Sequence, residues 1–440
     1  MGGNYLNGVL NFDHKPDKDY KWSTSLFVST WDGNSTLFVN EATLDEGGQT
    51  ELFSDIHRTG FKTDNYEVRF KSDYSKSFGE TSKIEAGYQY RLKDETGAFR
   101  YYDFLESIDD WSEDMTLHND MHYVRHIHSL YATYGGELAG FQYQGGLRAE
   151  HTDRSLAANQ IYGYNKFDIF PTFHITRPLP NNQQLQTSYS RRINRPESWF
   201  LNPSPSYSDS YLVQTGTPDL LPEITDSYEL NYMRFTKVGF ISGEAYYRQN
   251  KNSFAQNMNM QDDGRMRANY INVGKSYSYG VELSSNLTLS EYFNAYISAN
   301  LYNHIIDNDL VPDNVDNSLL RSNFTLNTNI MATKSTRFQV TGFYQSPSLT
   351  HQGRISGVYG VNLALNQEFF NKQLSATLSV RDVFKTMVYN FEAFEEGSST
   401  DFTFNMEQQV VMLSLRYRIN NYQNNRHRED SSPQGGGGLF

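Results

Sequence analysis

The sequence predicts an all-β protein, a transmembrane antiparallel β-barrel. Apolar and polar residues alternate with a period of two along most of the chain, as they do in strands with one face in an apolar medium. Short and long connections also alternate between the predicted strands, which is typical of membrane barrels. In addition, 15% of the residues are aromatic, although the chain has no apolar run long enough for a membrane helix.

The alternation is clearest over residues 276–303. There, Val281 and Leu283 alternate with Glu282 and Ser284, and the pattern resumes after a short break, which predicts two strands joined by a tight turn. The same pattern predicts about seventeen strands, near residues 4–14, 20–40, 65–78, 82–92, 118–134, 141–152, 165–177, 184–194, 225–236, 239–250, 267–288, 293–303, 321–333, 337–346, 358–370, 374–385 and 402–419.

The connections between these strands alternate in length. Short connections are predicted near 15–19, 77–81, 135–140, 178–183, 236–238, 334–336 and 371–373. Long polar loops are predicted near 41–64, 93–117, 153–164, 195–224, 251–266, 304–320, 347–357 and 386–401. A soluble sandwich has no reason to keep its short turns at one end, so a membrane barrel is favoured. The chain also shows no repeat of fixed period, which disfavours a propeller.

The strand count predicts that the barrel is incomplete at its N-terminus. If the strand near 402–419 ends at the periplasmic side, the strand near 4–14 runs inward, and an odd number of strands does not close the usual even-stranded barrel. The first three residues also lack the features of a secretory signal. We expect residues 1–420 to form this barrel and residues 421–440 to form a flexible Gly-rich tail.

Composition and motifs argue against several classes of function. The formal net charge of −13 disfavours a nucleic-acid partner. The absence of cysteine excludes a disulfide framework and a thiol nucleophile. The chain contains no G-x-S-x-G, no H-E-x-x-H and no phosphate loop. We therefore expect neither an enzyme nor a cofactor.

Two clusters of potential metal ligands favour a structural interpretation. His118, His122, His126 and His128 share one strand parity, but residues four apart lie about 13 Å from each other along a strand. Only the last two are close enough to chelate. The acidic loop 307–316 lacks the glycine and terminal glutamate of a helix-loop-helix calcium site. We expect a polar strand face and a solvated loop, with no metal.

Five segments carry a family resemblance: FDIFPTF at 167–173, LQTSYSRRINRP at 185–196, WFLNP at 199–203, GTPDLLPE at 216–223 and SYEL at 227–230. Together they resemble the barrel of TonB-dependent outer-membrane receptors from Bacteroidota. The usual form of the fourth segment is G-N-P-x-L-K-P-E. Because Thr217 and Leu221 depart from it, no role of the missing asparagine and lysine is carried over to this chain.

The resemblance implies a fold, a location and partners. Such barrels have 22 strands around a plug, so the chain would supply strands 6–22, without the plug or a TonB box. It implies an outer-membrane receptor or transporter for TonB-dependent nutrient uptake. Its partners would be outer-membrane lipid, the barrel assembly machinery, an unknown nutrient ligand, the TonB complex through the missing N-terminal part, and a surface lipoprotein as a further candidate. A standalone passive channel and a structural or adhesin-like surface barrel remain alternatives.

Aromatic residues crowd the loop 197–222, where loops of such barrels meet their ligand. We therefore predict ligand contact for Trp199, Phe200, Tyr207 and Tyr211, with packing of the loop onto itself as the alternative. Ligand contact is also predicted for the neighbouring Arg195, with pairing to lumen or loop carboxylates as the alternative. The other motif residues are predicted to be structural, the arginines pairing with carboxylates and the prolines shaping the loop: Arg191, Arg192, Asn194, Pro196, Asn202, Pro203, Gly216, Pro218, Leu220, Pro222 and Glu223. Arg148 and Glu150 are predicted to form an ion pair on the lumen wall.

Overall fold

The structure is a computed structural model, and it describes residues 2–44, 51–207, 211–262, 264–307, 317–395 and 398–419. Its largest sheet has 18 strands. One of these, β5 (Asp110–Glu113), is a short addition to β4, and the other seventeen (18 − 1) follow each other antiparallel in chain order. They are β1 (Gly2–His14), β2 (Tyr20–Leu44), β3 (Glu51–Phe78), β4 (Ser82–Leu105), β6 (Asn119–Leu138), β7 (Phe141–Ala157), β8 (Ile161–Leu179), β9 (Gln183–Asn194), β12 (Glu223–Thr236), β13 (Gly239–Lys251), β16 (Lys275–Ser290), β17 (Phe293–Asp307), β18 (Ser318–Met331), β19 (Thr336–Gln345), β22 (Val358–Phe369), β23 (Leu374–Val380) and β26 (Val411–Tyr417).

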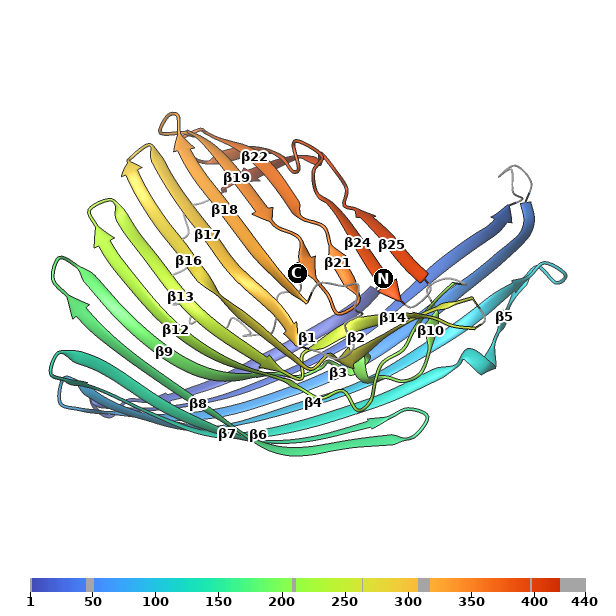
Figure 1. The fold of residues 1–440 in the computed structure, drawn as a ribbon, viewed down its shortest axis with the longest axis horizontal. Helices are drawn as coiled ribbons and strands as arrows, with labels where there is room; N and C mark the ends of the chain where they lie inside the picture. The colour runs from blue at the N-terminus through green and yellow to red at the C-terminus, as the bar shows by residue number, and fades with distance from the viewer. Residues whose placement is uncertain are drawn as a thin grey trace.

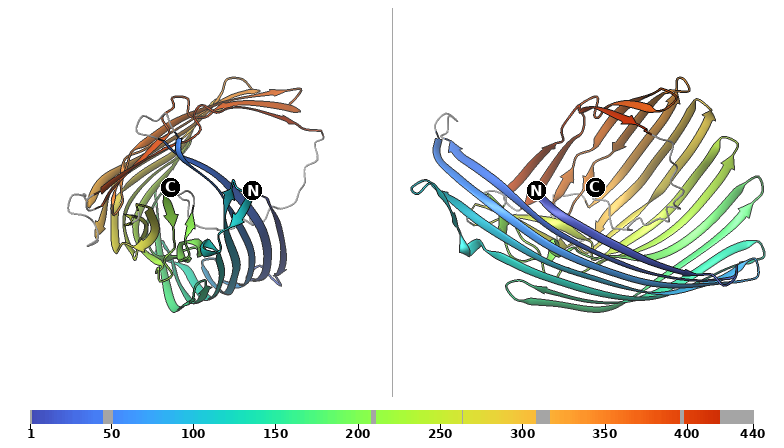
Figure 2. Two further views of the ribbon diagram at one scale, coloured as in Figure 1. Left: turned by 90° about the vertical axis from the view of Figure 1, so that its right-hand side faces the viewer. Right: turned by 180° about the vertical axis from the view of Figure 1, so that it is seen from behind.

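The large sheet curls into most of a barrel (Figure 1). Figure 2 shows its first strands and its last strands on the two sides of the opening, with the small elements drawn in green and yellow on the concave side. Among the described strands, no pairing joins β1 to β26. The predicted tail 421–440 and residues 308–316 of the acidic loop lie outside the described residues.

Two small sheets are built from four of the long connections. One four-stranded sheet contains β10 (Ser206–Tyr207), β11 (Leu212–Gln214), β14 (Phe254–Met260) and β15 (Met266–Asn272), next to the helix α1 (Ser198–Leu201) in sequence. A second contains β20 (Ser348–Leu349), β21 (Gly353–Ile355), β24 (Val388–Glu395) and β25 (Ser398–Asn405). A short 3-10 helix, η1 (Met115–Leu117), precedes β6.

Several predicted loops are in fact strand. The loops predicted near 41–64 and 93–117 are largely occupied by β2, β3 and β4, and β7 and β8 are joined by residues 158–160 alone. With 25 and 28 residues, β2 and β3 far exceed the roughly 9–11 residues that a tilted strand needs to cross a bilayer. Beyond the bilayer both faces of a strand meet water, so the apolar alternation fades although the pairing continues.

Two predicted strands each divide between two sheets. The segment 267–288 is β15 followed by β16, and the break lies at Gly274, whose φ of +79° is in the left-handed region that glycine tolerates. The segment 402–419 is the end of β25 followed by β26, and the predicted loop 386–401 contains β24. Both halves of each segment alternate with the same period, so periodicity carries no sign of the change of sheet.

The two faces of the curved sheet differ in chemistry. The outer face carries exposed leucines on strands far apart in sequence: Leu130, Leu147, Leu230, Leu283 and Leu363. Tyrosines of neighbouring strands border this apolar zone, with ring centroids 4.9 Å apart for Tyr189 and Tyr228 and 6.2 Å apart for Tyr228 and Tyr247. An apolar band with an aromatic border is the surface that a membrane barrel presents to lipid. No helix of the described residues is long and apolar enough to span a membrane.

Candidate ligand-binding site on the concave face

The loop between β9 and β12 folds back against the concave face of the wall. Its anchor is a buried cluster that joins Tyr123 of β6 and Leu156 of β7 to Leu201 of α1 and Leu220. None of these four side chains is more than 1% exposed. Burying a leucine side chain stabilises the folded state by about 1.5–3 kcal/mol. Leu201 and Leu220 therefore hold the two halves of the loop on the wall.

Further polar contacts attach the same loop to the wall. The Ser198 hydroxyl donates to Oε1 of Glu95 at 2.6 Å, and Nζ of Lys93 lies 3.0 Å from Oε2 of Glu197. Nη2 of Arg154 donates to the carbonyl of Pro218 at 3.0 Å. The wall partners lie on β4 and β7, so the contacts join the loop to two strands.

The motif residues shape the loop itself. The N–H of Gly216 donates to the carbonyl of Asn202 at 2.5 Å, and a Cβ on Gly216 would lie 2.5 Å from the Asn202 nitrogen. Only glycine permits this approach of two backbone segments. Pro196 and Pro222, at the two ends of the loop, are buried, while Pro203 is half-buried.

The loop, the wall and the strands β14 and β15 line a cavity of about 480 Å³. Four aromatic residues line it, Phe61 and Phe99 from the wall and Trp199 and Tyr270 from the loops. Neutral hydrogen-bonding side chains also line it, among them Thr63, Asn119, Asn202, Gln214, Thr215 and Gln256. Small-molecule sites typically measure about 300–1,000 Å³ and combine apolar walls with a few polar groups. By size and composition this cavity is the candidate ligand site.

An ion network lies on the same wall. Glu150 of β7 accepts from Nε of Arg148 at 2.5 Å and from Nη2 of Arg195 at 2.6 Å, and Nη2 of Arg91 lies 3.7 Å from its Oε1. The carboxylate is 3% exposed. The predicted ion pair between Arg148 and Glu150 is present, and Arg195 connects the loop to it.

The remaining charged motif residues lie at the junction of β9 and β12. Arg191 forms a bidentate pair with Asp226, at 2.7 Å from Nε and 3.0 Å from Nη2, on the outer face that also carries Tyr189. Arg192 lies opposite Thr225, and Asn194 opposite Glu223; these pairs share the concave side.

The structure separates the five residues for which ligand contact was predicted. Trp199 lines the cavity. Phe200 packs against the buried cluster, and Arg195 belongs to the ion network. Tyr207 and Tyr211 are not part of the cavity lining. For these four residues ligand contact stays a prediction without support from their position.

Other cavity residues were missed by the sequence analysis. Phe61 and Phe99 fell within the predicted loops 41–64 and 93–117, and Tyr270 within a strand assigned to the barrel. The available signal was that Phe61 is flanked by polar residues, as in a strand. The signal is weak because both faces of this part of β3 carry polar residues.

A second loop holds one wall of the cavity in place. The Gln352 side chain accepts from the N–H of Met258 at 2.8 Å and donates to the carbonyl of the same residue at 2.9 Å. Nε2 of the buried His351 lies 3.2 Å from Oδ1 of Asn257. Both contacts hold β14, which supplies Gln256 to the cavity.

The contact between His351 and Asn257 is expected to weaken in acid. Burial lowers the pKa of His351 to about 4, whereas an undocked histidine titrates near 6.5. Between these two pH values the undocked state therefore binds more protons than the docked state. The free energy of docking is constant above pH 6.5 and falls by about 1.4 kcal/mol per pH unit as the pH decreases towards 4. Protection factors of the β14 amides measured from pH 8 to pH 4 check this. His351→Gln should remove the pH dependence, and an unchanged dependence in that variant would assign it to another group.

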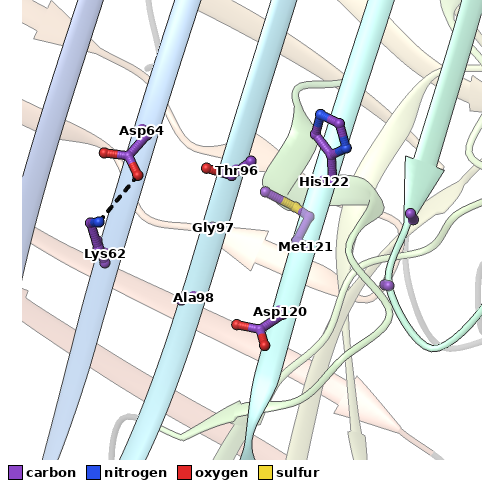
Figure 3. Close-up of a pocket in the computed structure, with 10 residues that line it drawn as sticks. Lys62, Asp64, Thr96, Gly97, Ala98, Asp120, Met121 and His122 are labelled. Atoms are coloured by element: carbon purple, nitrogen blue, oxygen red, sulfur yellow. Dashed lines mark ion pairs between the residues drawn. The ribbon is translucent and has the colours of Figure 1, made fainter.

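A further concavity of about 470 Å³ lies on the outer face of β3, β4, β6 and β7. Figure 3 shows Lys62 paired with Asp64, and Asp120 and His122 on β6. His122 is bonded to Asp94 at 2.9 Å, so the charged groups are paired locally. No group of three metal-ligating side chains occurs among the described residues.

Comparison with known proteins agrees with this architecture. Residues 13–417 match the model of a family described as "Outer membrane protein beta-barrel family". No curated protein matches the chain in sequence.

Three solved structures share the fold. The ferric-catecholate import receptor Fiu from K12 E. coli is 12% identical with a TM-score of 0.68, over 94% of this chain and 64% of that one. The siderophore receptor PiuA from Acinetobacter baumannii is 10% identical with a TM-score of 0.65, over 94% and 64%. FpvA from P. aeruginosa is 12% identical with a TM-score of 0.65, over 94% and 56%. The chain thus spans less than two thirds of each of these structures.

Proposed function

We propose that this chain, which belongs to the outer membrane protein beta-barrel family and lies in the outer membrane, is the barrel part of a receptor that takes up a nutrient. The cavity between the folded-back loop and the wall carries this proposal. A receptor must hold its ligand before transport, and such a cavity offers a preformed site facing the barrel interior. We include in the proposal that the chain acts without catalysis.

The finer proposal is a TonB-dependent receptor of the type found in Bacteroidota. It is supported by the motif segments 167–173 and 185–196 and by the shared fold of Fiu and PiuA. On this proposal the chain supplies strands 6–22 of a 22-stranded barrel. Its plug and TonB contact come from further N-terminal sequence, and its other partners are lipid, the assembly machinery and a surface lipoprotein.

A passive channel is the second candidate function. It is supported by the strong curvature of the large sheet (Figure 2), because a meander of seventeen strands encloses an aqueous lumen when it closes. The docked loop disfavours a passive channel. A loop that a buried core anchors inside the barrel narrows the pore, and a channel gains nothing for diffusion from the polar cavity that this loop forms. A structural or adhesin-like barrel has no need of such a cavity.

The mass of the native protein separates these candidates. An antibody against residues 197–222 captures the protein from native outer membranes after mild cross-linking. The receptor proposal expects an intact mass well above 50.8 kDa and co-capture of TonB. A protein of 50.8 kDa that gives steady conductance in planar bilayers would establish the passive channel instead.

A further inference from the structure

Among the described residues, the cavity lining contains two charged side chains, Lys62 and Glu95. Lys62 is paired with Asp64 at 3.4 Å, and Glu95 receives both the Ser198 hydroxyl at 2.6 Å and Nζ of Lys93 at 2.9 Å. Within the described part of the lining, no uncompensated charge faces a ligand, so a bound ion would lose its hydration without gaining a counter-charge from these residues.

The arginines of the same wall do not change this. Arg91, Arg148 and Arg195 are outside the cavity lining, and each lies within 3.7 Å of Glu150. A carboxylate-rich or catecholate-rich iron chelate is an anion that would need such cations at the site. Their absence from the lining disfavours this class of ligand.

One face of the cavity is a fixed aromatic platform. The Trp199 ring lies 3.8 Å from that of Phe200 and 5.4 Å, edge to face, from that of Tyr270. These neighbours hold the indole, yet 54% of Trp199 remains exposed. Across the cavity, Phe61 and Phe99 form a second aromatic pair with centroids 4.9 Å apart. Rings held in this way bind a flat apolar face at low entropic cost.

The polar lining consists of amides and hydroxyls, which donate and accept hydrogen bonds without charge. Asn119 is 6% exposed, and its Oδ1 has no hydrogen-bond partner within the described part of the chain. A buried amide oxygen left unpaired costs about 1–3 kcal/mol. A ligand hydroxyl would satisfy it. The side chains of Gln214 and Gln256 add two further amides to the same cavity.

We infer that this cavity binds a neutral polyhydroxylated ligand of the carbohydrate class. The C–H face of a sugar ring carries slight positive charge and packs against the negative face of Trp199, while its hydroxyls pair with the amides. This inference rests on the proposed receptor function and names its substrate class. It differs from the iron chelates named for Fiu and PiuA, and the difference follows from the uncharged lining.

The test measures binding directly on the purified full-length protein in detergent. An array of neutral and acidic glycans is screened, and the tightest glycan is titrated by calorimetry, with ferric citrate as the anionic competitor and a neutral peptide library as a second probe set. We expect a neutral glycan to bind and ferric citrate not to displace it. Trp199→Ala should weaken binding at least about tenfold, whereas Trp199→Phe, which keeps a ring, should stay within about threefold.

Trp111→Ala is the matched control, because Trp111 packs on Phe104 at 5.3 Å, outside the cavity, and should leave affinity unchanged. The inference is overturned if no neutral glycan binds, if ferric citrate or a peptide binds instead, or if both alanine variants lose affinity equally. These outcomes are distinct from failure of the receptor function. If a glycan binds but TonB is not captured, only the proposal of TonB-coupled uptake is rejected. If an iron chelate binds and TonB is captured, only the proposed ligand class is rejected.

Discussion

Replacing Glu150 by glutamine is expected to destabilise the barrel by about 3–5 kcal/mol, because it removes one partner of a buried ion network. The carboxylate receives Arg148 and Arg195 and faces Arg91. An amide of the same shape would leave three guanidinium groups close together without a counter-charge. The effect should extend to the loop, since Arg195 joins the loop to this network.

The free energy of unfolding is measured by urea titration of the protein in detergent, with heat-modifiable migration as the readout. Glu85→Gln is the matched control, since Glu85 is a half-exposed carboxylate paired with Lys83 and such pairs contribute about 0–1 kcal/mol. Equal losses in the two variants would show that Glu150 is not the centre of the network.

Replacing Leu220 by alanine is expected to release the loop from the wall at a cost of about 2–5 kcal/mol. Leu220 is 1% exposed and packs in the cluster with Tyr123, Leu156 and Leu201. The truncated side chain would leave a void that the wall strand and the short α1 cannot fill by shifting.

Leu221 provides the control, because the same substitution there removes a side chain that is 41% exposed. Amide hydrogen exchange over residues 198–222 compares the two variants. At 1.4 kcal/mol per tenfold change, Leu220→Ala should accelerate exchange by roughly 30-fold or more, and Leu221→Ala should leave it nearly unchanged. The opposite order would mean that the loop is held from its other side.

The sequence was sufficient for the wall of the barrel. The all-β antiparallel fold is confirmed by the sheet, and the outer-membrane location by the family match. Apolar and polar residues alternate around Leu230 and Leu283 because one face of each strand meets lipid and the other meets the lumen. Pairing in chain order then follows from the short turns.

The cavity could not be predicted in the same way. Its walls come from β3 and β4 above the bilayer, from α1, and from β14 and β15 of another loop. Phe61 and Trp199 line the same cavity because the loop docks on the wall, and this docking depends on the shape of the buried cluster around Leu201. Periodicity describes the local surroundings of a strand and contains no information on which loop packs against it. Trp199 was found because it stands in an aromatic-rich loop segment.

The docking of the loop between β9 and β12 inside the barrel is the central claim, and cysteine labelling tests it most directly. The chain has no cysteine, so single variants give an unambiguous signal with a membrane-impermeant maleimide on intact cells. Ser198→Cys replaces a buried residue bonded to Glu95, and Tyr211→Cys an exposed residue of the same loop. We expect rapid labelling at 211 and protection at 198 until the protein is unfolded. Rapid labelling at both positions in the folded protein would contradict the docking of this loop.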